Sequence, residues 1–185
     1  MPSLFGGGAA REGRQKAAGY VRAIWADPAE SDVAWLATTA TGGDLDHARW
    51  ELRYARRALG LLAAQRDALD DRTGSLVAHA VSEAMLSDPA VAVSAAALAE
   101  RQFNDRLTAY RDALQQRSRE TPGTRLGRVL LVFAGSVRAA RGAGLQPAGE
   151  LLARYLDEAN AALRQAFGSV DLPEDARPST LGRSH

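Results

Sequence analysis

Two histidine–glutamate pairs contain the side chains best suited to chemistry in this sequence. His47 and Glu51 are four residues apart, and His79 and Glu83 repeat that spacing. Residues four apart share one face of a helix, so each pair could supply two metal ligands or a general acid and base. Two such pairs on facing helices would complete a four-ligand metal site, which is one hypothesis for this chain.

The arrangement of these residues also argues against a metal site. Di-iron helical bundles use a Glu-x-x-His spacing, which is absent from the sequence. His79 and Glu83 fall opposite Val77 and Val81 on their predicted helix, which is the side that normally faces solvent. We therefore expect a solvated pair at His79 and Glu83, and we expect no cofactor.

His47 and Glu51 lie instead within an apolar part of their predicted helix. At about 100° per residue, the helix from Asp44 to about residue 70 has a leucine stripe on one side of this pair and Trp50 and Tyr54 on the other. A polar pair in such surroundings needs hydrogen-bond partners. Two interpretations remain open: a core histidine bonded to Glu51, or a small-ligand site that also includes Tyr54.

Arg66 and Glu100 are charged residues at positions where the heptad patterns of two predicted helices require apolar side chains. Burying either charge alone would cost several kcal/mol, so each needs a partner or contact with water. One hypothesis pairs Arg66 with Glu100 and adds both to the candidate ligand site. The alternative is a partly exposed salt bridge at an end of the bundle.

Four arginines cover the remaining arc of the same helix, together with two aspartates. We expect this face to be solvated, although guanidinium groups also suit phosphate or nucleic-acid contacts, which is a second alternative function. The formal net charge of +1 argues against a nucleic-acid partner. The arginines are Arg49, Arg53, Arg56 and Arg57.

Helical periodicity and capping signals account for nearly all of the chain between residues 9 and 167. They predict an all-α, single-domain bundle of five to seven helices arranged around the third and the fifth. Residues 1–8 and 168–185 are expected to be flexible ends. The predicted helices cover about residues 17–25, 28–39, 44–70, 75–86, 88–118, 126–137 and 147–167.

Composition narrows the class of protein without defining its function. The 185 residues include no cysteine and no apolar stretch long enough to cross a bilayer. The start of the sequence also lacks the apolar segment typical of a signal peptide. We therefore expect a cytoplasmic protein without a membrane partner. The first functional hypothesis is a helical interaction or assembly protein without catalytic activity, which binds a protein partner or self-associates. The alternative is a bundle that binds a small ligand or metal at His47 and Glu51, with enzymatic activity left open.

Overall fold

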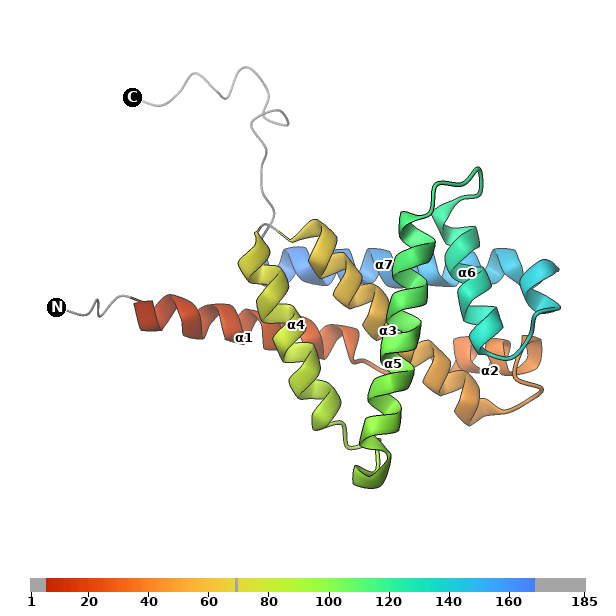
Figure 1. Cartoon of the computed structure of the whole chain (residues 1–185), viewed down its shortest axis with the longest axis horizontal. Coiled ribbons are helices and arrows are strands. Elements are labelled where there is room, and N and C mark those ends of the chain that lie inside the picture. The colour runs from red at the N-terminus through yellow and green to blue at the C-terminus, as the bar shows by residue number, and fades with distance from the viewer. Residues whose placement is uncertain (1–5, 69, 169–185) are drawn as a thin grey trace, which may run out of the picture.

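The computed structural model describes residues 6–68 and 70–168, and Figure 1 shows their arrangement. These residues form seven α-helices and two short 3-10 helices, and the described ranges contain no strand. The elements are α1 (Gly6–Ile24), α2 (Glu30–Thr39), α3 (Leu45–Asp67), α4 (Asp71–Leu86), η1 (Val93–Ala95), α5 (Ala96–Gln115), α6 (Pro122–Phe133), η2 (Ala139–Arg141) and α7 (Leu145–Phe167). The prediction of an all-α helical bundle is confirmed.

Helix α3 lies at the centre of the bundle and contacts each of the other α-helices. Leu52, Leu59 and Leu62 are buried along it, as expected for apolar residues at helical spacing. Helix α7 packs against α1, α3 and α6, so α7 rather than α5 accompanies α3 at the centre. Helices α4 and α5 form a V (Figure 1). Residues 87–95 join the two helices at the point of the V, and we term this segment the α4–α5 connection.

Side-chain caps explain where several helices begin. The Asp44 carboxylate accepts a hydrogen bond from the His47 backbone N–H at 2.9 Å and so caps α3, which confirms the predicted start of this helix at Asp44. Asp70 accepts from the Thr73 N–H at 2.6 Å, so α4 begins at Asp71. The predicted start of this helix at about residue 75 is therefore wrong, because the earlier aspartate already supplies a start signal.

Two other predicted boundaries are wrong because polar and glycine residues adopt turn conformations there. Asp88 does not start α5; its carboxylate accepts from the Ala90 N–H within a turn, and the helix begins only at Ala96. Helix α6 ends at Phe133, since Gly135 has a φ of 92°, a left-handed conformation that favours glycine.

The ends of the bundle differ in detail from the predicted boundaries. Helix α1 begins at Gly6, within the segment 1–8 that was expected to be flexible, whereas most of 168–185 lies outside the described residues. Helix α2 begins at Glu30 rather than at residue 28, because Asp27 pairs with Arg53 instead of capping the helix. In the ranges that the structure describes, no helix has the length and apolar character needed to cross a membrane.

Helices α6 and α7 cross at glycines, which bring their backbones together. A Cβ atom on Gly127 would lie 2.6 Å from the backbone nitrogen of Gly149. A Cβ atom on Gly149 would lie 2.9 Å from the carbonyl oxygen of Gly123. Side chains at these positions would push the two helices apart, so the crossing depends on the absence of a side chain.

Candidate functional site

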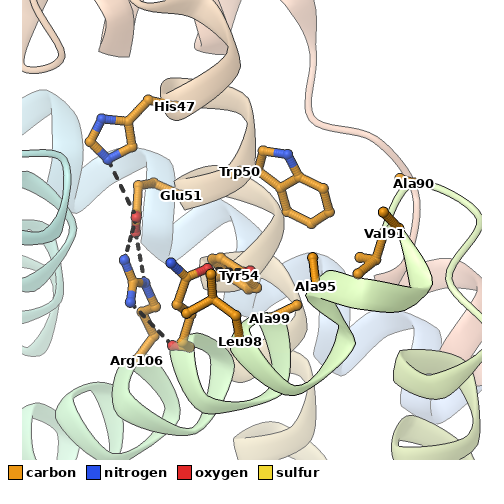
Figure 2. Close-up of a pocket in the computed structure, with 12 residues that line it drawn as sticks. His47, Trp50, Glu51, Tyr54, Ala90, Val91, Ala95, Leu98, Ala99 and Arg106 are labelled. Carbon is orange, nitrogen blue, oxygen red and sulfur yellow. Dashed lines mark hydrogen bonds and ion pairs between the residues drawn. The ribbon is translucent and has the colours of Figure 1, made fainter.

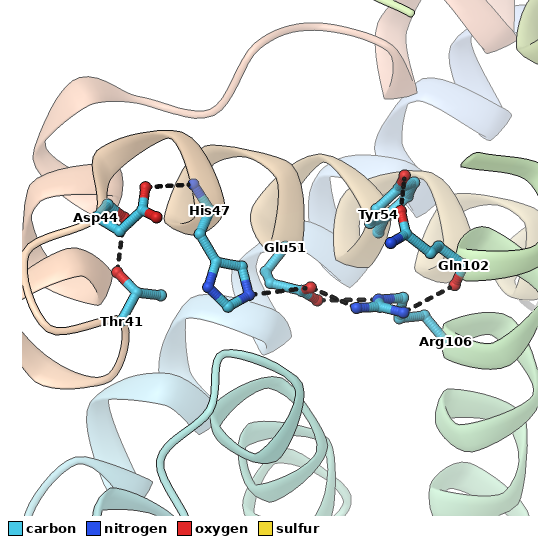
Figure 3. A network of polar contacts seen from close by, with 7 residues as sticks. All are labelled: Thr41, Asp44, His47, Glu51, Tyr54, Gln102 and Arg106. Carbon is cyan, nitrogen blue, oxygen red and sulfur yellow. Dashed lines mark hydrogen bonds and ion pairs between the residues drawn. The ribbon is translucent and has the colours of Figure 1, made fainter. Parts of the chain in front are cut away.

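The N-terminal turns of α3 place His47 and Glu51 on one face of the helix. Thr41 donates a hydrogen bond to the carbonyl oxygen of Asp44 at 2.6 Å, and Asp44 in turn caps the helix (Figure 3). This geometry determines where the first turn begins and so which way the next residues point. His47 and Glu51 then follow one turn apart, and Glu51 extends toward Arg106 of α5.

Glu51 forms a bidentate ion pair with Arg106 of α5. Nε of Arg106 donates to Oε2 of Glu51 at 3.0 Å, and Nη2 donates to Oε1 (Figure 3). The Glu51 side chain is only 3% exposed and that of Arg106 is 12% exposed. Burial opposes the charge of Arg106, but the hydrogen bonds and the charge of Glu51 outweigh burial and raise its pKa. The Arg106 guanidinium therefore stays charged in a largely buried position.

Further contacts hold the Arg106 guanidinium in place. Nη1 donates to the backbone carbonyl of Gln102 at 3.2 Å. The guanidinium also lies over the ring of Phe133, 4.3 Å from its centroid, and 5.3 Å from that of Tyr54. Such planar stacking favours a guanidinium over an ammonium group. Arg106 is thus fixed by a carboxylate, a carbonyl and two aromatic rings.

His47 lies outside this ion pair, on its solvent side. Its Nε2 atom is 3.6 Å from Oε1 of Glu51, within the range of an ion pair (dashed line in Figure 3) but beyond hydrogen-bond distance, and its side chain is 41% exposed. The predicted core histidine that satisfies Glu51 is therefore wrong. Arg106 satisfies the carboxylate, so His47 remains accessible to solvent and to other molecules.

A pocket of about 380 Å³ opens beside the Glu51–Arg106 pair, between α3, α5 and the α4–α5 connection (Figure 2). We term it the α3–α5 pocket. One side is polar and aromatic, formed by His47, Trp50, Glu51, Tyr54, Gln102 and Arg106. The other side is apolar, formed by Ala90, Val91, Ala92, Ala95, Leu98 and Ala99. A few convergent polar groups facing an apolar wall are typical of small-molecule sites.

Aromatic residues of α3 form one wall of the pocket. The ring centroids of Trp50 and Tyr54 are 5.5 Å apart, with a tilt of 37°. The Tyr54 hydroxyl donates to Oε1 of Gln102 at 3.0 Å, which joins α3 to α5 beside the ion pair (Figure 3). Burial raises the pKa of Tyr54. The hydroxyl therefore remains a hydrogen-bond donor at neutral pH.

Three of the five candidate ligand-binding residues line this pocket, namely His47, Glu51 and Tyr54. Arg66 is exposed near the end of α3 and pairs with its neighbour Asp67 at 2.7 Å. Glu100 is exposed and lines a separate groove between α4 and α5. The hypothesis of an Arg66–Glu100 core pair is therefore wrong, because each charge reaches solvent on its own helix.

The two histidine–glutamate pairs do not form one site. His79 and Glu83 are 3.3 Å apart on α4, and both side chains are 68% exposed, as expected for a solvated pair. Within residues 6–68 and 70–168, no group of three or more His, Cys, Asp or Glu side chains is arranged to hold a metal ion. The hypothesis of a four-ligand site at His47, Glu51, His79 and Glu83 is wrong for this reason.

The four arginines of α3 are not a solvated face. Arg57 is 3% exposed and forms a 2.8 Å ion pair with Asp88, which is 4% exposed. The other three are 29%, 15% and 18% exposed, and each pairs with a carboxylate of a different segment. These pairs are Arg49–Glu30, Arg53–Asp27 and Arg56–Glu158. Their charges are compensated within the fold, which removes the main support for an anion or nucleic-acid site.

Sequence reasoning missed Arg106, Gln102 and Trp50 as pocket residues. The available signal was that Gln102 and Arg106 are four residues apart, so they share one face of α5. Nothing in their spacing indicated that this face lies against Glu51, which is 55 residues away.

No protein-family model, curated protein or solved structure matches the chain.

Proposed function

We propose that this protein binds a small organic molecule in the α3–α5 pocket. The observation that carries the proposal is a buried Glu51–Arg106 pair that borders a cavity of about 380 Å³. That volume lies in the lower part of the range for small-molecule sites, roughly 300–1,000 Å³. Removing two charges from water is costly, and such pairs are often more useful for specificity than for stability. At the border of the pocket, the Glu51–Arg106 pair is well placed to orient a bound molecule.

The pocket combines the two properties that ligand binding requires. The alanine-rich wall and the Trp50 ring supply apolar area, whose burial provides most of the binding free energy. Gln102, Arg106 and the accessible His47 supply polar groups that orient a ligand. Helices α3 and α5 are held together by the ion pair and the Tyr54–Gln102 hydrogen bond, so these groups are positioned before a ligand arrives.

A fragment screen by protein NMR tests the proposal. Binding in the pocket should shift the signals of the Trp50 indole N–H and the Gln102 side-chain amide. The variant Ala95→Trp should abolish these shifts, because Ala95 lines the pocket and a large side chain there fills it. Ala97→Trp is the matched control, since Ala97 is exposed on the adjacent turn and does not line the pocket.

Two results would contradict the proposal. One is a diverse library that produces no shifts at the pocket. The other is a set of hits that bind Ala95→Trp and the native protein equally well. Circular dichroism and the melting temperature of Ala95→Trp would establish that the variant is folded.

A second candidate is self-association through the α4–α5 connection and its neighbours. Leu86, Val93 and Leu98 are 77%, 95% and 48% exposed at this end of the molecule. Exposed apolar residues close together often mark an interaction surface. Light scattering should then show dimers that Val93→Glu and Leu86→Glu convert to monomers. A native protein that stays monomeric at high concentration would contradict this candidate.

A further inference from the structure

Charges around the α3–α5 pocket are compensated in pairs. Glu51 is bound by Arg106, and beside the pocket Asp88 is bound by Arg57. Asp88 also accepts from the Trp25 indole N–H, at 3.4 Å. Neither buried carboxylate therefore needs a charge from a ligand. From this we infer the ligand class: an uncharged planar ring that carries carbonyl or ring-nitrogen acceptors on one edge. This inference rests on the proposed function.

A cationic ligand would find guanidinium groups already placed against the aromatic wall. The guanidinium groups of Arg53 and Arg57 lie 4.9 and 5.9 Å from the Trp50 ring centroid, and Arg106 lies 5.3 Å from that of Tyr54. The attraction of these rings for cations is thus already used by the protein. Because each of these guanidinium groups is paired with a carboxylate, an added cation would find no free buried counter-charge in this region.

An anionic ligand would meet the carboxylate of Glu51. Arg106 directs two of its nitrogens to that carboxylate, so its charge is not free for a second anion. His47 is the other basic residue of the pocket lining, and it lies on the exposed side. A net charge on the ligand would lose hydration without gaining a buried counter-charge, which is unfavourable.

Hydrogen-bonding groups in the pocket favour acceptors on the ligand. The Tyr54 hydroxyl donates to Oε1 of Gln102, which uses one of the two lone pairs of that oxygen, whereas the two N–H groups of Nε2 have no partner among the described hydrogen bonds. Arg106 has five N–H groups, and its described hydrogen bonds use three of them. Gln102 and Arg106 therefore offer donors on the same side of the pocket, next to each other on α5.

The shape of the pocket favours a flat ring. Trp50 faces the side formed by Ala95 and Val91, as Figure 2 shows, and small side chains there leave a smooth apolar surface. A ring between these walls would contact the indole on one side and methyl groups on the other. Its acceptor-bearing edge would then point toward Gln102 and Arg106.

Three molecules of one shape test the ligand class. Naphthalene-2-carboxamide, naphthalene-2-carboxylate and naphthalene-2-carboxamidine share a ring and differ in charge, being neutral, negative and positive at neutral pH. Calorimetric titration of the full chain should show that the carboxamide binds at least about tenfold more tightly than either charged compound. Ala95→Trp should remove this binding, and Ala97→Trp should retain it.

Gln102→Leu tests the role of the amide donor. It should weaken carboxamide binding about three- to tenfold, the range expected for one neutral hydrogen bond. Gln115→Leu, an exposed position at the end of α5, is the matched control and should have no effect.

The possible failures of this inference and of the proposed function are distinguishable. Tighter binding of the carboxylate or carboxamidine, abolished by Ala95→Trp, would overturn the ligand class and leave the pocket as a binding site. Failure of all three compounds to bind would also overturn the ligand class. The proposed function itself fails if the wider fragment screen produces no shifts at the pocket, or if its hits bind Ala95→Trp and the native protein equally well.

Discussion

Arg57 of α3 and Asp88 of the α4–α5 connection form an ion pair of 2.8 Å in which both side chains are almost completely buried. The Arg57 guanidinium also stacks on Trp25, with its carbon 4.1 Å from the ring centroid. Asp88 begins the segment that forms the apolar wall of the α3–α5 pocket. This pair therefore anchors the connection to the centre of the bundle.

Asp88→Asn should destabilise the protein strongly, because it leaves the Arg57 charge buried without a counter-charge. The expected loss in free energy of unfolding is about 3–5 kcal/mol, measured by urea denaturation. Asp67→Ala, which removes one partner of the exposed Arg66–Asp67 pair, is the control and should cost less than about 1 kcal/mol.

Adding Arg57→Met to Asp88→Asn should recover part of the lost stability, since no unpaired charge then remains. A double variant less stable than Asp88→Asn alone would show that the stacking of Arg57, and not its charge, dominates. A loss below about 1 kcal/mol for Asp88→Asn would contradict the anchoring role.

Glu51 and His47 should differ sharply in their contributions to stability, although they are adjacent on one face of α3. Glu51→Gln leaves Arg106 with no charged partner and should lower the free energy of unfolding by about 2–3 kcal/mol. This loss is smaller than that expected for Asp88→Asn, because Arg106 borders the pocket whereas Arg57 is almost completely buried. His47→Ala should change stability by less than about 0.5 kcal/mol, because the side chain is half-exposed and makes no hydrogen bond to Glu51. Equal losses for the two variants would contradict this assignment.

The crossing of α6 and α7 should not tolerate a methyl group. Gly127→Ala places a Cβ 2.6 Å from a backbone nitrogen of α7 and should cost about 1–3 kcal/mol by forcing the helices apart. Gly19→Ala is the matched control, since Gly19 lies in α1 with nothing within 4 Å of the added atom. It should stabilise the protein by about 0.5–1 kcal/mol through helix propensity. Thermal or urea unfolding of both variants measures the two changes in stability, which should have opposite signs.

High pH should unfold the protein through its tyrosines. Burial raises the pKa values of all four, Tyr20, Tyr54, Tyr110 and Tyr155, above the ordinary value of 10.0. The unfolded state therefore releases phenolic protons at a lower pH than the folded state. Stability from these groups is complete below pH 10 and is lost as the pH rises from there toward the folded-state pKa values.

Ultraviolet absorbance of tyrosinate and near-ultraviolet circular dichroism measure this effect together. Ionisation should coincide with loss of the folded signal, whereas the same titration in denaturant should be centred near the ordinary pKa. Ionisation centred near pH 10 with an unchanged folded signal would show that the tyrosines are accessible, contrary to their burial.

Local patterns allowed much of the fold to be predicted. The Asp44 cap, the apolar stripe of α3 and the solvated pair at His79 and Glu83 depend on spacing within one helix, and a sequence records that spacing directly. The boundaries of α4, α5 and α6 were less predictable. Asp70 and Asp88 are equally good helix starts by residue type, but only Asp70 caps a helix, because Asp88 is bound by Arg57.

By itself, then, the sequence determined that His47 and Glu51 share one face of a helix, because helical periodicity is a property of neighbouring residues. Only the tertiary structure decided which residues meet that face. Arg106 takes the carboxylate of Glu51 and leaves His47 at the edge of a pocket. The position of Arg57 on its helix predicted a solvated side chain. Arg57 is buried instead, because the α4–α5 connection packs over it and supplies Asp88 as its partner. Such pairings depend on how helices pack across long separations in the chain, and a repeat of 3.6 residues contains no information about the partner helix.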